Sequence, residues 1–96
     1  MREYQKGCVW LYSIRDRKSA LWETPFASLN DETAIRDFRA FGKSPSRIYL
    51  YPDLELYCVG FCNLETGEVT GLDKPDFIEQ GIDLTGSAEK EVNNVE

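Results

Sequence analysis

Residues 54–69 read LELYCVGFCNLETGEV, an alternating stretch followed by a turn and the start of a second apolar stretch. Side chains of a strand alternate between its two faces, so the first part predicts a strand from Leu54 to about Cys62. The segment NLETGEV predicts the turn, with Gly67 supplying its backbone freedom, and a return strand at Glu68–Leu72. One face of the long strand is then expected to carry Leu54, Leu56, Cys58, Gly60 and Cys62, and the other Glu55, Tyr57, Val59 and Phe61.

Three further stretches complete the predicted elements. CVWLYSI at 8–14 has aromatic and β-branched residues on both faces and predicts a central strand. ALWETPFAS at 20–28 predicts an edge strand, because Pro25 interrupts it. SLNDETAIRDFRAFGKSP predicts a helix over 31–42, with Asn30 as N-cap and Gly42 ending it before Pro45. Its apolar stripe would be Ala34, Ile35, Phe38 and Phe41. One helical turn is predicted after Pro75, within 73–82.

These elements predict an α+β fold, a small antiparallel sheet with one helix packed on one face. A chain of 96 residues is expected to form one domain. We assign 1–82 to that domain and 83–96, with few apolar residues, to a flexible C-terminal tail. The sheet face opposite the helix would present aromatic side chains to a partner or to a second copy, which predicts a homo-oligomer. The residues expected on that face are Trp10, Tyr57 and Phe61.

Composition argues against several kinds of chemistry. The chain has no histidine, which removes the commonest general base and the commonest metal ligand. Cys58 and Cys62 would point the same way on a strand, about 13 Å apart, too far for a disulfide or for one metal ion. With Cys8 they are interpreted as reduced thiols. We therefore predict no enzyme, no metal site and no cofactor. The absence of a membrane-spanning run and of a secretory signal predicts a cytoplasmic protein.

Charge is unevenly distributed along the chain. The net charge is −6, yet residues 1–47 hold nine Lys and Arg against six Asp and Glu, while 48–96 hold two against eleven. Cations near aromatic residues such as Trp10 and Trp22 are typical of surfaces that bind single-stranded nucleic acid. Ordinary surface cations are the alternative, and the acidic second half could instead engage a basic protein. The candidate nucleic-acid-binding residues are Arg15, Arg17, Lys18, Arg36, Arg39, Lys43, Arg47 and Tyr12.

Four stretches together carry a family resemblance: Leu11–Asp16, Pro25–Phe26, Asn30–Phe38 and Tyr51–Gly67. In this combination the chain resembles the small non-structural proteins of gokushovirus-type microviruses, which are single-stranded DNA phages. The resemblance implies a protein of the infected host's cytoplasm that assists the synthesis or packaging of single-stranded DNA by binding DNA or replication proteins. It implies no catalytic residues. The alternative function is a protein-interaction module that engages a host or phage protein, including a defence protein. The lead MREYQKGC and Cys62 depart from the family pattern.

Overall fold

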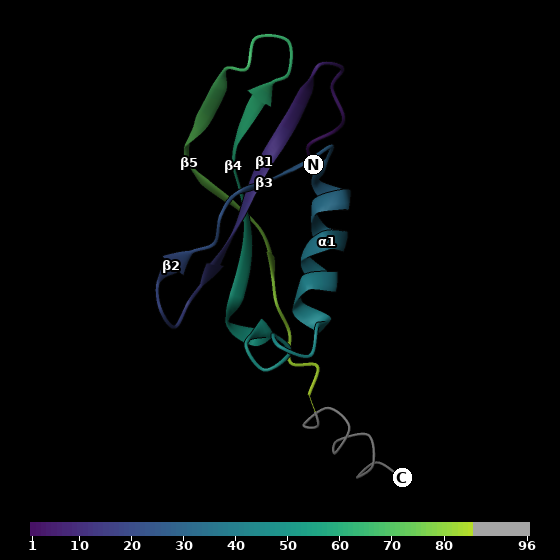
Figure 1. The fold of residues 1–96 in the computed structure, drawn as a ribbon. Helices are drawn as coiled ribbons and strands as arrows, with labels where there is room; N and C mark the ends of the chain where they lie inside the picture. The colour runs from purple at the N-terminus through teal and green to yellow at the C-terminus, as the bar shows by residue number, and fades with distance from the viewer. Residues whose placement is uncertain (86–96) are drawn as a thin grey trace.

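The computed structural model describes residues 1–85 and shows an antiparallel sheet with one α-helix against one face (Figure 1). The helix, α1, spans Asp31–Lys43, and a 3₁₀ turn spans Tyr51–Asp53. This arrangement confirms the predicted α+β class. The five strands are β1 (Cys8–Asp16), β2 (Leu21–Trp22), β3 (Phe26–Ser28), β4 (Leu54–Asn63) and β5 (Val69–Gln80).

Strand β1 is the central strand, as the sequence predicts. It pairs with β4 along its whole length, and β2 and β3 pair in succession with its other edge. The sheet order is therefore β2-β1-β4-β5, with β3 beside β1. Pro25 lies between β2 and β3, where its missing N–H costs no ladder hydrogen bond, so the predicted edge position is also confirmed.

The helix begins as predicted and ends for a different reason. The Asn30 side chain accepts a hydrogen bond from the Thr33 backbone N–H at 2.8 Å, and the Thr33 hydroxyl completes a reciprocal capping box. The helix continues to Lys43, so Gly42 does not end it. Gly42 is buried, and a Cβ there would lie 2.0 Å from Cδ1 of Tyr51. Glycine is needed at this position because the Tyr51 ring packs against the helix backbone.

The core lies between α1 and the sheet. The side chain of Asp31, at the first position of α1, is buried with it and accepts a hydrogen bond from the Tyr12 hydroxyl at 2.7 Å. The N-terminal segment also reaches this point, since the Arg2 backbone N–H donates to the same carboxylate at 3.0 Å. The buried core side chains are Tyr12, Ile14, Ala34, Phe38, Tyr51, Leu54, Leu56 and Cys58.

The helical turn predicted after Pro75 is wrong, because β5 continues through this region to Gln80. Strand β5 is an edge strand, and its ladder to β4 is interrupted between the pairs Gly60–Gly71 and Cys58–Asp76. Pro75 falls in this interruption, where a missing N–H is tolerated. Leu72 and Ile78, on either side of it, both pack against the core.

A β-bulge in β4 corrects the predicted alternation. Tyr12 of β1 pairs with Cys58 and Leu11 pairs with Gly60, which leaves Val59 as an extra residue. An extra residue reverses the facing of all side chains beyond it. Cys58 and Cys62 therefore lie on opposite faces of the sheet rather than on one, and both are free thiols, as is Cys8.

The C-terminal boundary is described only in part. Of the predicted tail at 83–96, residues 86–96 lie outside the described residues. Leu84 packs against the core, so the packed part of the chain extends past the predicted boundary at residue 82. Within residues 1–85, no helix has the length and apolar character needed to cross a membrane.

Candidate nucleic-acid interface

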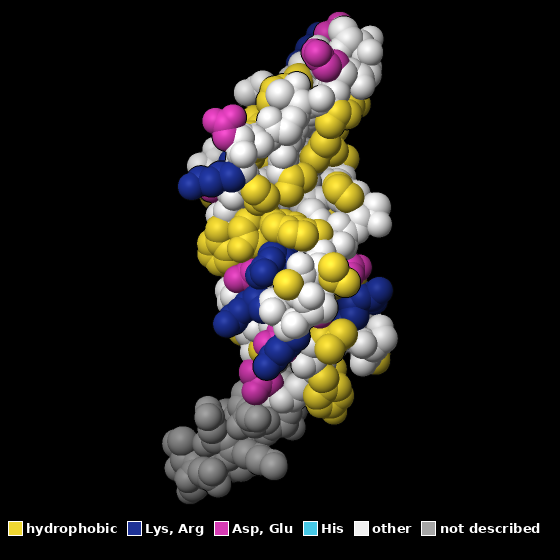
Figure 2. Space-filling model, turned by 90° about the vertical axis from the view of Figure 1, so that its left-hand side faces the viewer, with side chains coloured by type: hydrophobic (Ala, Val, Ile, Leu, Met, Phe, Trp, Pro, Cys, Tyr) yellow, Lys and Arg dark blue, Asp and Glu magenta, His cyan; other side chains and the backbone are white. Residues whose placement is uncertain are grey.

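The sheet face opposite α1 carries a row of three aromatic side chains. Tyr57 of β4 lies between Trp22 of β2 and Phe77 of β5, with ring centroids 4.9 Å and 5.7 Å from its own. Trp22 and Phe77 are 42% and 51% exposed, so the row is open to solvent at both ends. Figure 2 views this side of the molecule and shows hydrophobic side chains gathered at its middle. We call Trp22, Tyr57 and Phe77 the aromatic row.

The strand register builds the aromatic row. Tyr57 lies opposite Phe77 on β5 and opposite Ser13 on β1, while Trp22 lies opposite Arg15, two residues further along β1. Ser13 is buried, and its hydroxyl donates to the Glu23 carbonyl at 2.6 Å. Because the serine side chain is small, the rings of Trp22 and Tyr57 can meet above β1.

Polar contacts hold Tyr57 in place. Its hydroxyl donates to Oε1 of Glu55 at 3.2 Å, and Nη1 of Arg15 contacts the same oxygen at 3.3 Å. Burial raises the pKa of Tyr57, and the negative charge of Glu55 raises it further. Tyr57 therefore keeps its phenol proton, and its hydroxyl is held by Glu55, which is in turn held by Arg15.

Cations lie beside the aromatic row. The positive charges of Arg15 and Arg17 act directly on the Tyr57 hydroxyl, and Lys18 follows in the turn between β1 and β2. Within residues 1–85, Arg17 and Lys18 form no ion pair, whereas Arg15 is paired with Glu55. Figure 2 shows Lys and Arg side chains directly below the hydrophobic patch. Three of the seven predicted cations thus belong to the β1–β2 hairpin that also carries Trp22.

The other four predicted cations lie on α1 or just after it. Arg36 contacts Asp37 at 3.7 Å, and Arg39 forms a two-point ion pair with Glu79 of β5, with both N···O distances 2.8 Å. The Arg47 guanidinium lies 4.1 Å from the centroid of the Phe41 ring. Lys43 is the last residue of α1. Because α1 covers the opposite face of the sheet, the structure divides the predicted cations between two surfaces.

Tyr12 cannot act as a stacking platform, so this part of the prediction is wrong. It is fully buried, and its hydroxyl is bonded to Asp31 beneath α1. Trp10 lies two residues before Tyr12 on β1, which contains no extra residue, so both side chains lie on the same face of the sheet. Phe61 pairs with Trp10 across the two strands, and the centroids of their rings are 5.8 Å apart. Trp10 and Phe61 therefore lie on the helix side, next to the Arg2 guanidinium, and only Tyr57 lies on the predicted partner face.

Phe77 is absent from the predicted partner face because the sequence predicts a helical turn in its segment. The segment DKPDFIEQ is also compatible with an edge strand, because an edge strand can accommodate Pro75. That interpretation would predict Phe77 on a strand. Trp22 lies near the first basic cluster in the sequence, but it is not among the predicted site residues. Among residues 1–85, no three His, Cys, Asp or Glu side chains are grouped so that they could hold a metal ion.

Sequence comparison places this α+β protein in a phage family. The family model described as "Phage ORF5 protein" matches residues 9–84, which include the helix and all of the strands except Cys8, the first residue of β1. The chain belongs to this family. No curated protein and no solved structure matches the chain.

Proposed function

We propose that this phage protein is a non-catalytic accessory protein that binds single-stranded DNA on the aromatic row. The observation that carries the proposal is the exposed row of Trp22, Tyr57 and Phe77 on a sheet face that no element within residues 1–85 covers, next to a β1–β2 turn that contains Arg17 and Lys18. Bases stack on exposed aromatic rings while neighbouring cations contact the phosphates. The resemblance to microvirus non-structural proteins supports a role in synthesis or packaging of a single-stranded genome in the host cytoplasm.

The aromatic row suits a single strand better than a duplex. Its rings form one tilted pair and one T-shaped pair, and a base can reach a ring face only when it is unstacked from its own neighbours. The protein also has a net charge of −6, which disfavours the many phosphate contacts on which duplex binding depends. Stacking must therefore supply a large part of the affinity.

Anisotropy titration of a labelled oligodeoxythymidine at low salt tests this proposal. Stacking contributes about 1–3 kcal/mol per base, so Tyr57→Ala and Trp22→Ala should each weaken binding about tenfold or more. Arg17→Ala should weaken it by a smaller factor. Tyr49→Ala is the matched control, because Tyr49 is 79% exposed, lies in the loop after α1 and is not part of the aromatic row.

Two results would contradict the proposal. One is the absence of any binding to single-stranded DNA at low salt. The other is equal weakening by Tyr57→Ala and Tyr49→Ala. If the unbound protein instead sediments as a dimer that Tyr57→Ala dissociates, and DNA has no effect, the aromatic row is an interface between copies. That outcome would favour the alternative of a protein-interaction module.

A further inference from the structure

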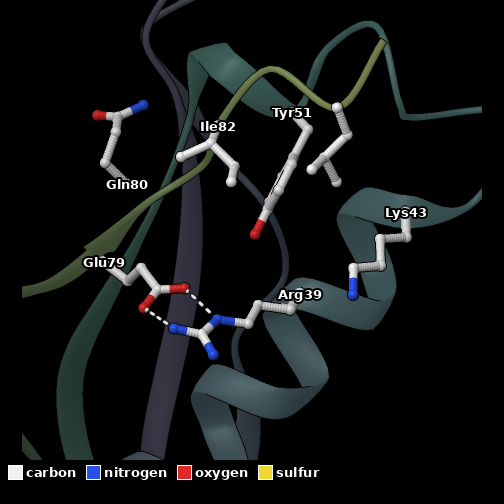
Figure 3. A pocket seen from close by; sticks show the side chains of 7 residues that line it. Arg39, Lys43, Tyr51, Glu79, Gln80 and Ile82 are labelled. Atoms are coloured by element: carbon white, nitrogen blue, oxygen red, sulfur yellow. Dashed lines mark hydrogen bonds and ion pairs between the residues drawn. The ribbon is translucent and has the colours of Figure 1, made fainter. Parts of the chain in front are cut away.

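A second surface, on the helix side of the sheet, forms a cavity of about 410 Å³ between the C-terminal half of α1 and the end of β5 (Figure 3). Its volume falls in the range of cavities that hold small organic molecules. The lining residues are Arg39, Lys43, Tyr51, Glu79, Gln80, Ile82 and Leu84. They come from three separate parts of the chain, and they are distinct from the aromatic row.

One wall of this cavity is a fixed ion pair. Nε and Nη2 of Arg39 donate to the two carboxylate oxygens of Glu79, each at 2.8 Å (Figure 3). The pair holds the guanidinium in one orientation and leaves Nη1 without a partner among residues 1–85. Gln80 is also occupied, since its amide donates to the carbonyls of Pro52 and Leu54. The charge of Glu79 is therefore already matched by Arg39, and the amide N–H groups of Gln80 are already used within the fold.

Tyr51 directs a donor into the cavity. Tyr51 is only 2% exposed, and the centroid of its ring lies 5.2 Å from that of Phe38. Figure 3 shows its hydroxyl pointing toward Arg39. Within the described residues, this hydroxyl has no hydrogen-bond partner. Burial raises the pKa of Tyr51, so the hydroxyl keeps its proton. Among the described residues, no buried side-chain oxygen lacks a hydrogen-bond partner, so the Tyr51 hydroxyl is open to solvent in the cavity and can donate to a ligand there.

Two glycines fix the position of Tyr51. A Cβ at Gly42 would lie 2.0 Å from Cδ1 of the ring, and one at Gly81 would lie 1.9 Å from the Tyr51 carbonyl oxygen. The residue is therefore held between the helix backbone and the chain that follows β5. This close packing holds the ring where its hydroxyl faces the cavity.

The remaining groups define what the cavity would accept. Lys43 lines it with an ammonium group that forms no ion pair within residues 1–85. With Arg39 and Glu79 paired, Lys43 leaves the lining with one net positive charge. Ile82 and Leu84 supply apolar walls. We propose that this cavity binds a small organic oxyanion, a phosphate monoester or carboxylate on an apolar body, held by Lys43 and the Tyr51 hydroxyl.

Calorimetric titration with phenyl phosphate, benzoate and inorganic phosphate tests the site. Phenyl phosphate or benzoate should bind more tightly than inorganic phosphate, because only the organic anions can contact Ile82 and Leu84. A hydrogen bond to a charged group is strong, so Tyr51→Phe should weaken binding about tenfold while keeping the ring that packs on Phe38. Lys43→Ala, at an exposed position, should weaken binding by at least as much.

Matched controls separate this site from general charge effects and from the aromatic row. Lys74→Ala removes an exposed lysine of β5 outside the cavity, and Tyr57→Ala alters the row, so both should leave phenyl phosphate binding unchanged. The proposal is overturned if neither organic anion binds at about 10 mM, or if Lys43→Ala and Lys74→Ala have the same effect. Loss of DNA binding in Tyr57→Ala with intact anion binding would show that the two sites are independent.

Discussion

Asp31 shows how much one buried carboxylate organises at the N-terminal end of α1. Its side chain accepts hydrogen bonds from the Tyr12 hydroxyl and from the Arg2 backbone N–H, at 2.7 and 3.0 Å. Arg2 also contacts Asp76 of β5 through its guanidinium. In the sequence, Asp31 reads as a favourable charge in the first turn of a helix. In the structure it also joins β1, α1 and the N-terminal segment.

The Tyr12–Asp31 contact predicts a loss of stability at alkaline pH. Burial raises the pKa of Tyr12, and its hydrogen bond to Asp31 raises it further. The unfolded chain releases the tyrosine proton near pH 10, whereas the folded chain retains it, so the stabilisation is present below about pH 10 and is lost as pH rises above it. While the unfolded chain has lost this one proton and the folded chain retains it, the free energy of unfolding falls by about 1.4 kcal/mol per pH unit. Urea midpoints measured from about pH 8 to about pH 12 should therefore fall above about pH 10.

Tyr12→Phe isolates the contribution of this residue. The variant should be less stable than wild type at pH 7 by about 1–3 kcal/mol, because Asp31 loses a buried donor. Above pH 10 its stability should decline less steeply than that of wild type, since one titrating group has been removed. Parallel decline in the two proteins would show that Tyr12 does not carry the effect.

At the scale of elements, α1 depends on Gly42 to receive Tyr51. Gly42→Ala would place a methyl group 2.0 Å from the Tyr51 ring, so either the ring or the helix must move. Alanine has the higher helix propensity by about 1 kcal/mol, which alone would make the variant more stable. Overpacking costs about 1–3 kcal/mol and should outweigh it, lowering the urea midpoint. Ala40→Gly, on the exposed side of α1, is the control and should cost about 1 kcal/mol through propensity alone. A more stable Gly42→Ala protein would contradict the packing argument.

Local sequence signals predict the elements of this fold better than the faces of its strands. Asn30, the apolar stripe of α1 and Pro25 act within a few residues, and the helix and edge strands lie where they predict. The bulge at Val59 depends on how β4 meets β1, which no local pattern encodes, and it moves Phe61 to the helix side. The identity of Tyr57 as a surface aromatic was predictable from alternation, because it precedes the bulge. Its neighbours Trp22 and Phe77 come from other strands, so the row required the three-dimensional pairing.

At the scale of the whole molecule, the sheet separates two sets of positive charge. Arg15, Arg17 and Lys18 lie in the β1–β2 hairpin that carries Trp22, while the cations of α1 lie on the other side and include Arg39, which is paired with Glu79. The sequence alone shows that the first half of the chain is basic. It does not show that a sheet would divide this half into a surface with aromatic rings and a surface with a cavity.

This division predicts the salt dependence of DNA binding. For single strands, the slope of log K against log salt concentration is about −0.7 for each phosphate that the protein neutralises. Three cations beside the aromatic row give a slope of about −2, whereas contributions from all seven predicted cations would give about −5. Anisotropy titrations across a series of salt concentrations measure the slope directly. Arg17→Ala should make it less steep, and Arg36→Ala, on the exposed side of α1, should leave it unchanged. A slope near −5 that Arg36→Ala reduces would mean that the strand also contacts the helix side, and the aromatic row would then be only part of the DNA-binding surface.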